Sequence, residues 1–255
     1  MRRYGLIGRR LGHSYSKRWF EDMFVREGVW DAEYDLYEFD ELPEREALHR
    51  WVAEKELSGF NVTVPYKEAV VARLDELDGA AEAIGAVNCV EVRDGRLIGH
   101  NTDAPAFGET LRPLLREWHT SALVLGTGGA AKAVRYALEQ RGIEAMMVSR
   151  EPERHPGSVS YLEAEELVQE RFVLVNATPV GMTPDEAHTP WPYNYRLGMK
   201  HLCYDLVYNP EETRFMLDAE LCGAEVCNGL AMLCRQAELS WELFGSLGGF
   251  YKFNV

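Results

Sequence analysis

The chain is 255 residues long, 46% hydrophobic and 27% charged, and its 27 basic and 41 acidic side chains give a net charge of −14. A chain of this length forms one large domain or two modest ones, and its composition excludes the disordered, collagenous and disulfide-scaffold classes. Because the charge is acidic and no basic patch or tail stands out, we expect neither nucleic acid nor a membrane as a partner.

The five cysteines predict neither a disulfide framework nor a metal site. Their number is odd and no two of them form a C-x-x-C pair; they are Cys89, Cys203, Cys222, Cys227 and Cys234.

The first apolar run stops at Gly8 and is too short for a signal peptide, and no stretch approaches the ~20 apolar residues of a membrane span. We therefore expect a cytoplasmic protein without a bound metal.

Apolar runs of strand length alternate with amphipathic runs of helix length. The predicted strands span residues 4–7, 34–39, 60–64, 86–92, 122–125, 145–149, 172–176 and 202–206. The predicted helices span residues 17–28, 44–55, 66–77, 104–118, 130–141, 162–169, 212–221 and 230–243. Asp94-Gly95 is typical of a hairpin turn between Val92 and Leu97. Elsewhere helices separate the strands, which indicates βαβ units and parallel sheets.

The chain divides into two α/β sets near residue 103. The segment His100-Asn101-Thr102-Asp103 ends the first set, and a glycine-rich turn at Gly126 opens the second, with the helix over 104–118 as the connection. We expect a first domain over residues 1–103 and a Rossmann-type dinucleotide-binding domain over residues 104–229.

The glycine-rich turn predicts a nucleotide site. Gly126, Gly128 and Gly129 lie between a strand and a helix, where glycines let the backbone approach a pyrophosphate at the helix N-terminus. The pattern G-x-G-G-A is less complete than G-x-G-x-x-G, so on its own it leaves open a turn without a ligand. The next strand ends in Ser149-Arg150-Glu151 about 20 residues further on, where such domains choose between a ribose hydroxyl and a 2′-phosphate.

The residues at that position give mixed signals on the cofactor. Arg150 and Arg154 suit a dianionic 2′-phosphate, whereas Glu151 suits a free 2′-hydroxyl and repels a phosphate. The alternative is that all three are solvated loop charges. We favour NADP, and NAD stays open because of Glu151.

Polar side chains in the first domain suggest a substrate site. Ser14 and Ser16 follow the first strand, where they can bind an anion, although Ser16 can equally be a helix N-cap. Asn61 and Thr63 share one face of a strand that is expected to be apolar, and Pro65 is expected near the start of the following helix.

Several blocks together resemble the shikimate dehydrogenase family. They are G-H-S-Y-S from residue 12, N-V-T-V-P-Y-K from 61, G-A-V-N ending at 88 and N-T-D ending at 103, followed by G-T-G-G-A, N-A-T-P-V-G-M, Y-D-L-V-Y and N-G-L-A-M. The match covers residues 4–236. It implies an α/β protein with a mixed, mostly parallel first sheet, a Rossmann-type second domain and a C-terminal segment, 230–255, that packs back on the first domain.

The resemblance also implies an activity and a set of site residues. The reaction is the reversible reduction of 3-dehydroshikimate to shikimate by NADPH, a step of chorismate and aromatic amino-acid biosynthesis, in a monomer or homodimer. The implied substrate-binding residues are Ser14, Ser16, Asn61, Thr63, Asn88, Tyr208 and Gln236, and the catalytic pair is Lys67 and Asp103. The implied cofactor-binding residues are Gly126, Thr127, Gly128, Gly129, Ala130, Ser149, Arg150, Arg154, Thr178, Leu206, Gly229 and Met232.

The catalytic pair predicts a metal-free proton transfer. A free lysine is protonated at neutral pH, and an ionised aspartate beside it favours the ammonium form. We therefore expect Lys67 to donate a proton to the ketone oxygen and Asp103 to orient it. Two alternatives stay open: an NAD-using quinate/shikimate dehydrogenase, and a nucleotide-binding sensor that kept the fold without turnover.

Overall fold

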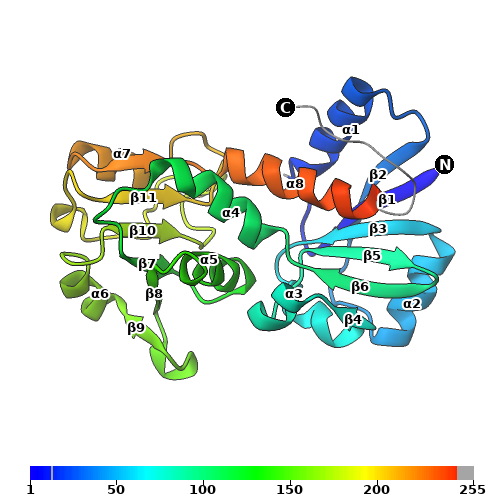
Figure 1. The fold of residues 1–255 in the computed structure, drawn as a ribbon, viewed down its shortest axis with the longest axis horizontal. Coiled ribbons are helices and arrows are strands. Elements are labelled where there is room, and N and C mark those ends of the chain that lie inside the picture. Colours follow the sequence, from blue (N-terminus) through cyan, green and yellow to red (C-terminus); the bar gives the residue numbers. More distant parts are fainter. Residues whose placement is uncertain (13, 246–255) are drawn as a thin grey trace. The chain divides into compact units, whose positions relative to one another are not determined.

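The computed structural model describes residues 1–12 and 14–245, and the chain forms two compact units (Figure 1). The first consists of residues 1–102 with the C-terminal segment from Cys234, and the second of Asp103–Leu233. Each unit is built around its own six-stranded sheet. Residues 246–255, which belong to the segment predicted to pack on the first domain, lie outside the described residues.

The first unit contains six strands and most of its helices in the first 100 residues. The strands are β1 (Arg2–Gly8), β2 (Ala32–Glu38), β3 (Leu57–Val62), β4 (Glu76–Leu77), β5 (Cys89–Arg93) and β6 (Arg96–His100). The helices are α1 (Ser16–Glu27), α2 (Arg45–Glu54), α3 (Gly79–Ile84), the 3-10 segment η1 (Ala69–Arg73), and α8 (Leu230–Gly245), which belongs to this unit from Cys234 onward.

The first sheet is mixed, with the order β2-β1-β3-β5-β6-β4. β1 pairs in parallel with β2 and β3, and β4 with β6, whereas β5 is antiparallel to both of its neighbours. The predicted hairpin turn is confirmed, since Asp94 and Gly95 have φ values of +51° and +76°. The sequence prediction of a mixed, mostly parallel first sheet is therefore confirmed.

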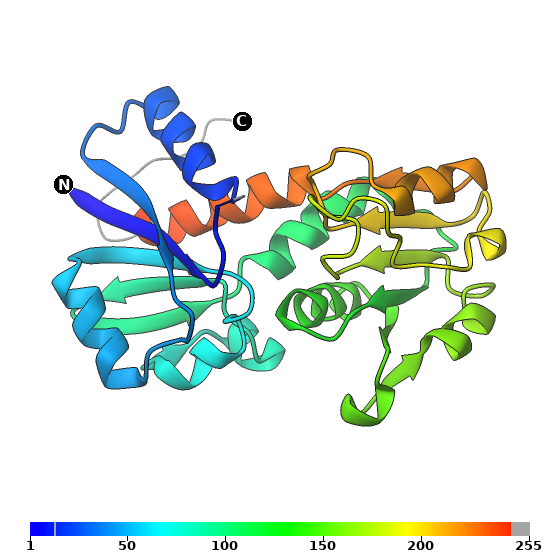
Figure 2. The same ribbon diagram turned by 180° about the vertical axis from the view of Figure 1, so that it is seen from behind.

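Helices cover both faces of the first sheet. One face packs against α1 and α8, which lie on the same side of the sheet (Figures 1 and 2), through a core that includes Tyr4, Phe20, Tyr34 and Trp241. The other face packs against α2, η1 and α3. Because successive strand residues point to opposite faces, the alternation along β3 directs Asn61 toward the face that carries α8.

The second unit is a Rossmann-like sheet. Its strands are β7 (Ser121–Leu125), β8 (Glu144–Ser149), β9 (Ser158–Ser160), β10 (Val173–Asn176), β11 (Leu202–Asp205) and β12 (Glu225–Cys227). Its α-helices are α4 (Asp103–Leu111), α5 (Gly129–Glu139), α6 (Tyr161–Leu167) and α7 (Arg214–Leu221), joined by the 3-10 segments η2 (Arg112–Leu114), η3 (Pro152–Arg154) and η4 (Asn194–Arg196).

The strand order of the second sheet creates a reversal between β7 and β10. The order is β12-β11-β10-β7-β8-β9, and every pairing is parallel. The chain runs outward from β7 to β9 and then returns to β10 on the other side of β7. Open α/β sheets bind ligands at the carboxyl ends of the strands at such a reversal, so this edge is where a dinucleotide is expected.

Two helix predictions are corrected. The helix predicted over 66–77 is wrong: Tyr66 N donates to the Thr63 carbonyl at 2.9 Å in a tight turn, Ala69–Arg73 form a 3-10 segment, and Glu76–Leu77 pair with β6 as β4. Long-range strand pairing therefore overrides the amphipathic pattern, and Pro65 does not start a helix. The helix predicted over 104–118 ends at Leu111 and gives way to the 3-10 segment η2, because Pro113 has no backbone N–H for an α-helical hydrogen bond.

Candidate active site

Polar side chains gather at one edge of the first sheet because of the strand directions. Parallel strands β1, β3 and β6 end at this edge, and antiparallel β5 begins there. Asn61 lies near the end of β3, Asn88 directly precedes β5, and Asn101 and Thr102 directly follow β6. Residues far apart in the sequence thus meet at one edge.

Asn61 joins three segments of the first unit. Its Oδ1 accepts a hydrogen bond from the Tyr34 hydroxyl at 2.9 Å, and its Nδ2 donates to the Asn88 carbonyl at 3.1 Å and to Ser240 Oγ at 2.8 Å. Burial raises the pKa of the Tyr34 phenol, so the hydroxyl stays protonated and able to donate. Both amide hydrogens of Asn61 are used inside the protein, which makes Asn61 a support for Asn88.

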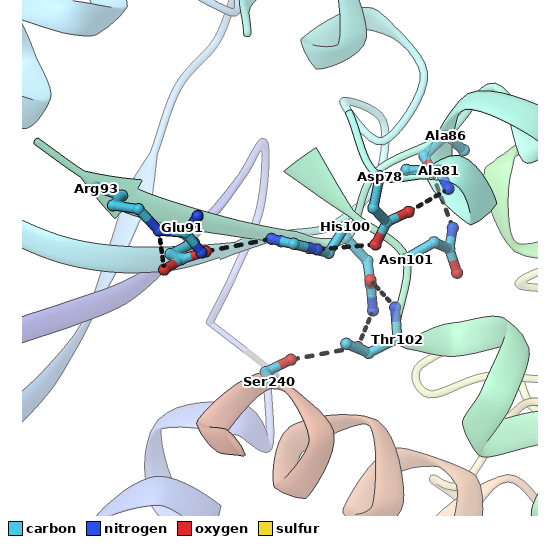
Figure 3. Close-up of polar contacts among 10 residues, drawn as sticks. Asp78, Ala81, Ala86, Glu91, Arg93, His100, Asn101, Thr102 and Ser240 are labelled. Atoms are coloured by element: carbon cyan, nitrogen blue, oxygen red, sulfur yellow. Dashed lines mark hydrogen bonds and ion pairs between the residues drawn. The ribbon is translucent and has the colours of Figure 1, made fainter. Parts of the chain in front are cut away.

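Asn88 fixes the segment that leads from β6 toward α4. Its Oδ1 accepts from the Thr102 backbone N–H at 2.7 Å, and its Nδ2 donates to Thr102 Oγ1 at 2.9 Å and to Gln236 Oε1 at 3.4 Å. Thr102 Oγ1 lies 3.2 Å from Ser240 Oγ on α8 (Figure 3). Because the Ser240 hydroxyl donates to the Gln236 carbonyl at 2.8 Å, it is Thr102 that donates to Ser240.

A row of polar and ionisable side chains supports the end of β6 (Figure 3). His100 Nδ1 is 2.8 Å from Asp78 Oδ2, and its Nε2 is 3.6 Å from Glu91 Oε2. Glu91 is buried and accepts two hydrogen bonds from Arg93, and Asp78 caps α3 by accepting from Ala81 N. Burial alone would raise the pKa of the Asp78 carboxyl, but the bonds from His100 and Ala81 outweigh it and the pKa is lowered.

The loop after β1 brings two predicted substrate residues to the same edge. Ser14 Oγ accepts from Ser16 N at 3.3 Å. Ser16 is the first residue of α1, and the N-cap is Tyr15, so the alternative reading of Ser16 as an N-cap is wrong. Thr63 N donates to the Ile7 carbonyl at 2.9 Å, which places Thr63 beside the end of β1.

The predicted catalytic residues belong to different units. Lys67 lies in the first unit, where its carbonyl accepts from Val87 N at 2.8 Å, next to Asn88. Asp103 is the first residue of the second unit and of α4, and its side chain is buried. Within the chain, Asp103 directly follows Thr102, which the two hydrogen bonds with Asn88 hold in place.

The glycine turn after β7 has the shape that a pyrophosphate site needs. Gly126 has a φ of +109°, and a Cβ at this position would lie 3.1 Å from Thr178 Cγ2 and 3.3 Å from the Ala177 carbonyl oxygen. Gly128 is the N-cap of α5 and has no side chain to cap it. The first backbone N–H groups of a helix lack partners inside the helix, so those of α5, from Gly129 and Ala130 onward, can bind an anion.

The end of β8 carries the residues predicted to select the cofactor. Ser149 is buried and its Oγ accepts from Glu151 N at 3.0 Å. Arg154 Nη1 lies 3.0 Å from Glu151 Oε2, with both side chains exposed. Arg150 is also exposed. The Glu151 carboxylate is therefore occupied by Arg154 and does not lie free beside Arg150.

Residues predicted for the nicotinamide half follow β10 and β11. Thr178 follows β10, and Leu206 follows β11. Gly229 lies so close to Leu206 that a Cβ at residue 229 would clash with the Leu206 carbonyl oxygen. Gly229 N donates to the Val207 carbonyl at 3.1 Å. Met232 is buried near the start of α8. Tyr208, three residues after the end of β11, is half-buried.

Sequence reasoning missed several of the supporting side chains. Ser240 could have been found, because it lies four residues after Gln236 and so shares its face of the predicted helix. Tyr34 gives no local signal, since its bond to Asn61 depends on the pairing of β1 with both β2 and β3. Thr102 carries a sequence signal only as part of the N-T-D block.

In residues 1–12 and 14–245, no group of three or more His, Cys, Asp and Glu side chains is placed to hold a metal ion. Over the same residues, no helix has the length and apolar character that a membrane span requires.

Comparison with known proteins agrees with this geometry. Residues 6–90 match the model of the shikimate dehydrogenase substrate binding domain. A shikimate dehydrogenase (NADP(+)) of Shouchella clausii is 36% identical over 255 residues, which cover 94% of this chain and 92% of the relative. The crystal structure of Thermus thermophilus shikimate 5-dehydrogenase with NADP(H) and shikimate has a TM-score of 0.84 at 36% identity and covers 96% of this chain and 93% of that chain.

A quinate dehydrogenase also shares the fold. Quinate dehydrogenase of Corynebacterium glutamicum in complex with NAD has a TM-score of 0.84 at 28% identity, covering 95% of this chain and 93% of that chain. The identity and coverage of the Shouchella and Thermus proteins are decisive, and this chain belongs to the shikimate dehydrogenase family.

Proposed function

We propose that this protein catalyses the reversible NADPH-dependent reduction of 3-dehydroshikimate to shikimate. The observation that carries the proposal is the similarity, over 96% of the chain, to a Thermus enzyme solved with NADP(H) and shikimate. The two sheet edges described above supply the polar groups and the glycine turn that such a reaction requires.

The second unit fits a dinucleotide. The space that a Cβ at Gly126 would fill lies at the reversal between β7 and β10, and the N-terminus of α5 faces that edge. The residues that would hold NADP are Gly126, Thr127, Gly128, Gly129 and Ala130 at the pyrophosphate, Ser149, Arg150 and Arg154 at the adenosine ribose, and Thr178, Leu206, Gly229 and Met232 at the nicotinamide. When bound, the cofactor supplies the hydride.

The first unit supplies the substrate site. We assign the substrate carboxylate to Ser14 and Ser16, which follow β1 in the chain, and to Thr63, whose backbone N–H donates to the Ile7 carbonyl in β1. The ring hydroxyls are assigned to Lys67, Asn88, Asp103 and Gln236, and Tyr208 is assigned to the same substrate. Asn61 is assigned to the same pocket, where its amide donates to the Asn88 carbonyl and supports Asn88. Residues 1–103 thus act as the substrate domain and residues 104–229 as the NADP domain.

Proton transfer is the task that remains for the side chains. In the reductive direction the Lys67 ammonium donates its proton to the oxygen of the substrate ketone, which becomes the hydroxyl of shikimate. Asp103 is the second member of the catalytic pair, and we assign to its carboxylate the role of orienting the ammonium. In the oxidative direction the neutral amine takes the proton from the hydroxyl.

A monomeric or homodimeric state and a cytoplasmic location stay predictions.

A second candidate function is an NAD-using quinate/shikimate dehydrogenase, and Glu151 is the observation that favours it. Values of kcat/KM for NADP and NAD, each measured with shikimate and with quinate, separate the two candidates. We expect the highest value with NADP and shikimate. A higher value with NAD and quinate would overturn the first candidate.

Glu151 is expected to weaken the preference for NADP. A 2′-phosphate must share Arg154 with the Glu151 carboxylate, which lies 3.0 Å from it. Exposed charge interactions contribute up to about 1 kcal/mol, so Glu151→Thr should raise the ratio of kcat/KM for NADP to that for NAD roughly fivefold. The control is Glu153→Thr, at an exposed residue of η3 next to Arg154, which should leave the ratio unchanged. An unchanged ratio in Glu151→Thr would contradict the assignment of this loop to the adenosine ribose.

A further inference from the structure

Asp205 is a buried carboxylate at the ligand edge of the second sheet. It ends β11 and its exposed fraction is 0%. Its Oδ1 accepts from Asn176 Nδ2 at 2.8 Å and from Val207 N at 2.9 Å, and its Oδ2 accepts from Thr213 Oγ1 at 2.6 Å. Because an ionised carboxylate only accepts hydrogen bonds, it sets the direction of all three.

Asn176 connects Asp205 to the loop after β10 through hydrogen bonds of fixed direction. With its Nδ2 directed at Asp205 and at the Val180 carbonyl, 3.2 Å away, its Oδ1 faces Thr178. There it accepts from Thr178 N at 3.0 Å and from Thr178 Oγ1 at 2.7 Å. If the Asn176 amide were reversed, its NH2 group would face two donors. Asp205, together with the Val180 carbonyl, thus keeps the Asn176 amide in the orientation that holds Thr178.

Asp205 also holds the turn after β11. Leu206 N donates to the Asn176 carbonyl at 2.9 Å, and Gly229 N donates to the Val207 carbonyl at 3.1 Å. Val207 N is itself bound to Asp205. Three of the residues assigned to the nicotinamide half, Thr178, Leu206 and Gly229, therefore lie two hydrogen bonds away from this carboxylate.

The charge at Asp205 is unfavourable for folding. Burial is the largest influence on this carboxyl and raises its pKa to about 6, against the lowering effect of its three hydrogen bonds. The three donors are neutral. Of the ionisable groups on the elements around it, the Cys203 thiol has its pKa raised by burial and by the Asp205 charge. On α7, Arg214 pairs with Asp218 at 2.8 Å. A buried anion with neutral partners calls for a functional explanation.

We propose that Asp205 is a positioning residue for the nicotinamide half of the cofactor, acting through Asn176 on Thr178 and through Val207 on the Leu206–Gly229 contact. This inference rests on the proposed function, because it assumes that NADP binds at this edge.

The variant Asp205→Asn tests the proposal without changing the size of the side chain. The amide keeps one oxygen to accept from Asn176 and Val207, which share Oδ1 in the wild type, but it carries no charge and turns an NH2 group toward Thr213, so these hydrogen bonds lose their charge-assisted strength. We expect the Kd for NADPH, measured by nicotinamide fluorescence, to rise roughly tenfold, as when hydrogen bonds to a charged acceptor become neutral ones. The KM for NADP should rise by the same factor, and the KM for shikimate should stay unchanged.

Asp218→Asn is the matched control. It makes the same isosteric change at another buried carboxylate, on α7, whose partner is Arg214. The Kd for NADPH should be that of the wild type. In addition, the Tm of Asp205→Asn at pH 7 should equal or exceed that of the wild type, because a raised pKa means that ionisation of Asp205 lowers the stability of the folded state. A merely structural role would instead lower the Tm together with the affinity.

A pH series with NADH provides a second readout. NADH lacks the 2′-phosphate, whose own ionisation lies near pH ~6. When the pH falls through the pKa of Asp205, about 6, the carboxyl loses its charge and holds the Asn176 amide and Val207 N less strongly. The Kd of the wild type for NADH should therefore rise below this pH, whereas that of Asp205→Asn should depend less on pH over the same range.

The outcomes are distinguishable. A Kd and a pH profile in Asp205→Asn equal to those of the wild type would overturn the positioning role, and so would a loss of affinity that comes with a lower Tm. A wild-type protein that binds neither NADPH nor NADH would instead contradict the proposed function itself.

Discussion

Replacing Lys67 with methionine is expected to lower kcat for shikimate oxidation by about 100-fold or more and to change KM little. Methionine keeps much of the apolar length of the side chain and removes the ammonium group. The ketone oxygen then has no proton donor in the reductive direction, and the hydroxyl has no base in the oxidative one. Steady-state rates with saturating NADP measure the effect.

The control for this variant is Lys55→Met, which makes the same change at the exposed C-cap of α2. Its kcat and KM should match those of the wild type. A large rise in KM with kcat preserved in Lys67→Met would show that Lys67 binds substrate and does not transfer the proton.

Phe244→Ala is expected to have the largest effect on stability. Phe244 is buried, stacks on Tyr4 with ring centroids 4.9 Å apart, and lies so close to Gly59 that a Cβ there would be 2.5 Å from its ring. Removing a buried phenylalanine side chain costs about 3–5 kcal/mol, and urea unfolding monitored by circular dichroism measures the loss.

The same variant should also weaken substrate binding. Phe244 anchors the helix that carries Gln236 and Ser240 against the first sheet, so a loosened α8 should raise the KM for shikimate. Trp30→Ala, at a residue that is 75% exposed, removes a larger aromatic side chain and should change stability by less than about 0.5 kcal/mol. Equal losses in the two variants would show that α8 does not depend on Phe244.

The parts of the fold that depend on local patterns could be predicted from the sequence. The glycine turn after β7 and the Asp94-Gly95 hairpin have backbone requirements that few residues other than glycine meet, so the sequence reveals them directly. The eight predicted strands all occur, with ends shifted by up to three residues.

The parts that depend on distant contacts could not be predicted. β4 exists because Glu76–Leu77 pair with β6, and the short edge strands β9 and β12, of three residues each, carry too few residues for a clear pattern. The hydrogen bond between Asn61 and Ser240 spans 179 residues. The position of Asp205 in the Y-D-L-V-Y block does not reveal its three neutral partners. They come from β10, from the turn after β11 and from the N-cap of α7.

The most direct measurement is a turnover assay in which the purified protein is mixed with shikimate and NADP and the absorbance of the reduced nicotinamide is followed. We expect the absorbance to rise with wild-type protein, to rise more slowly with NAD, and to stay close to the baseline with Lys67→Met. No reduced nicotinamide with either cofactor, from a protein that still binds NADPH, would contradict the account and favour a nucleotide-binding sensor.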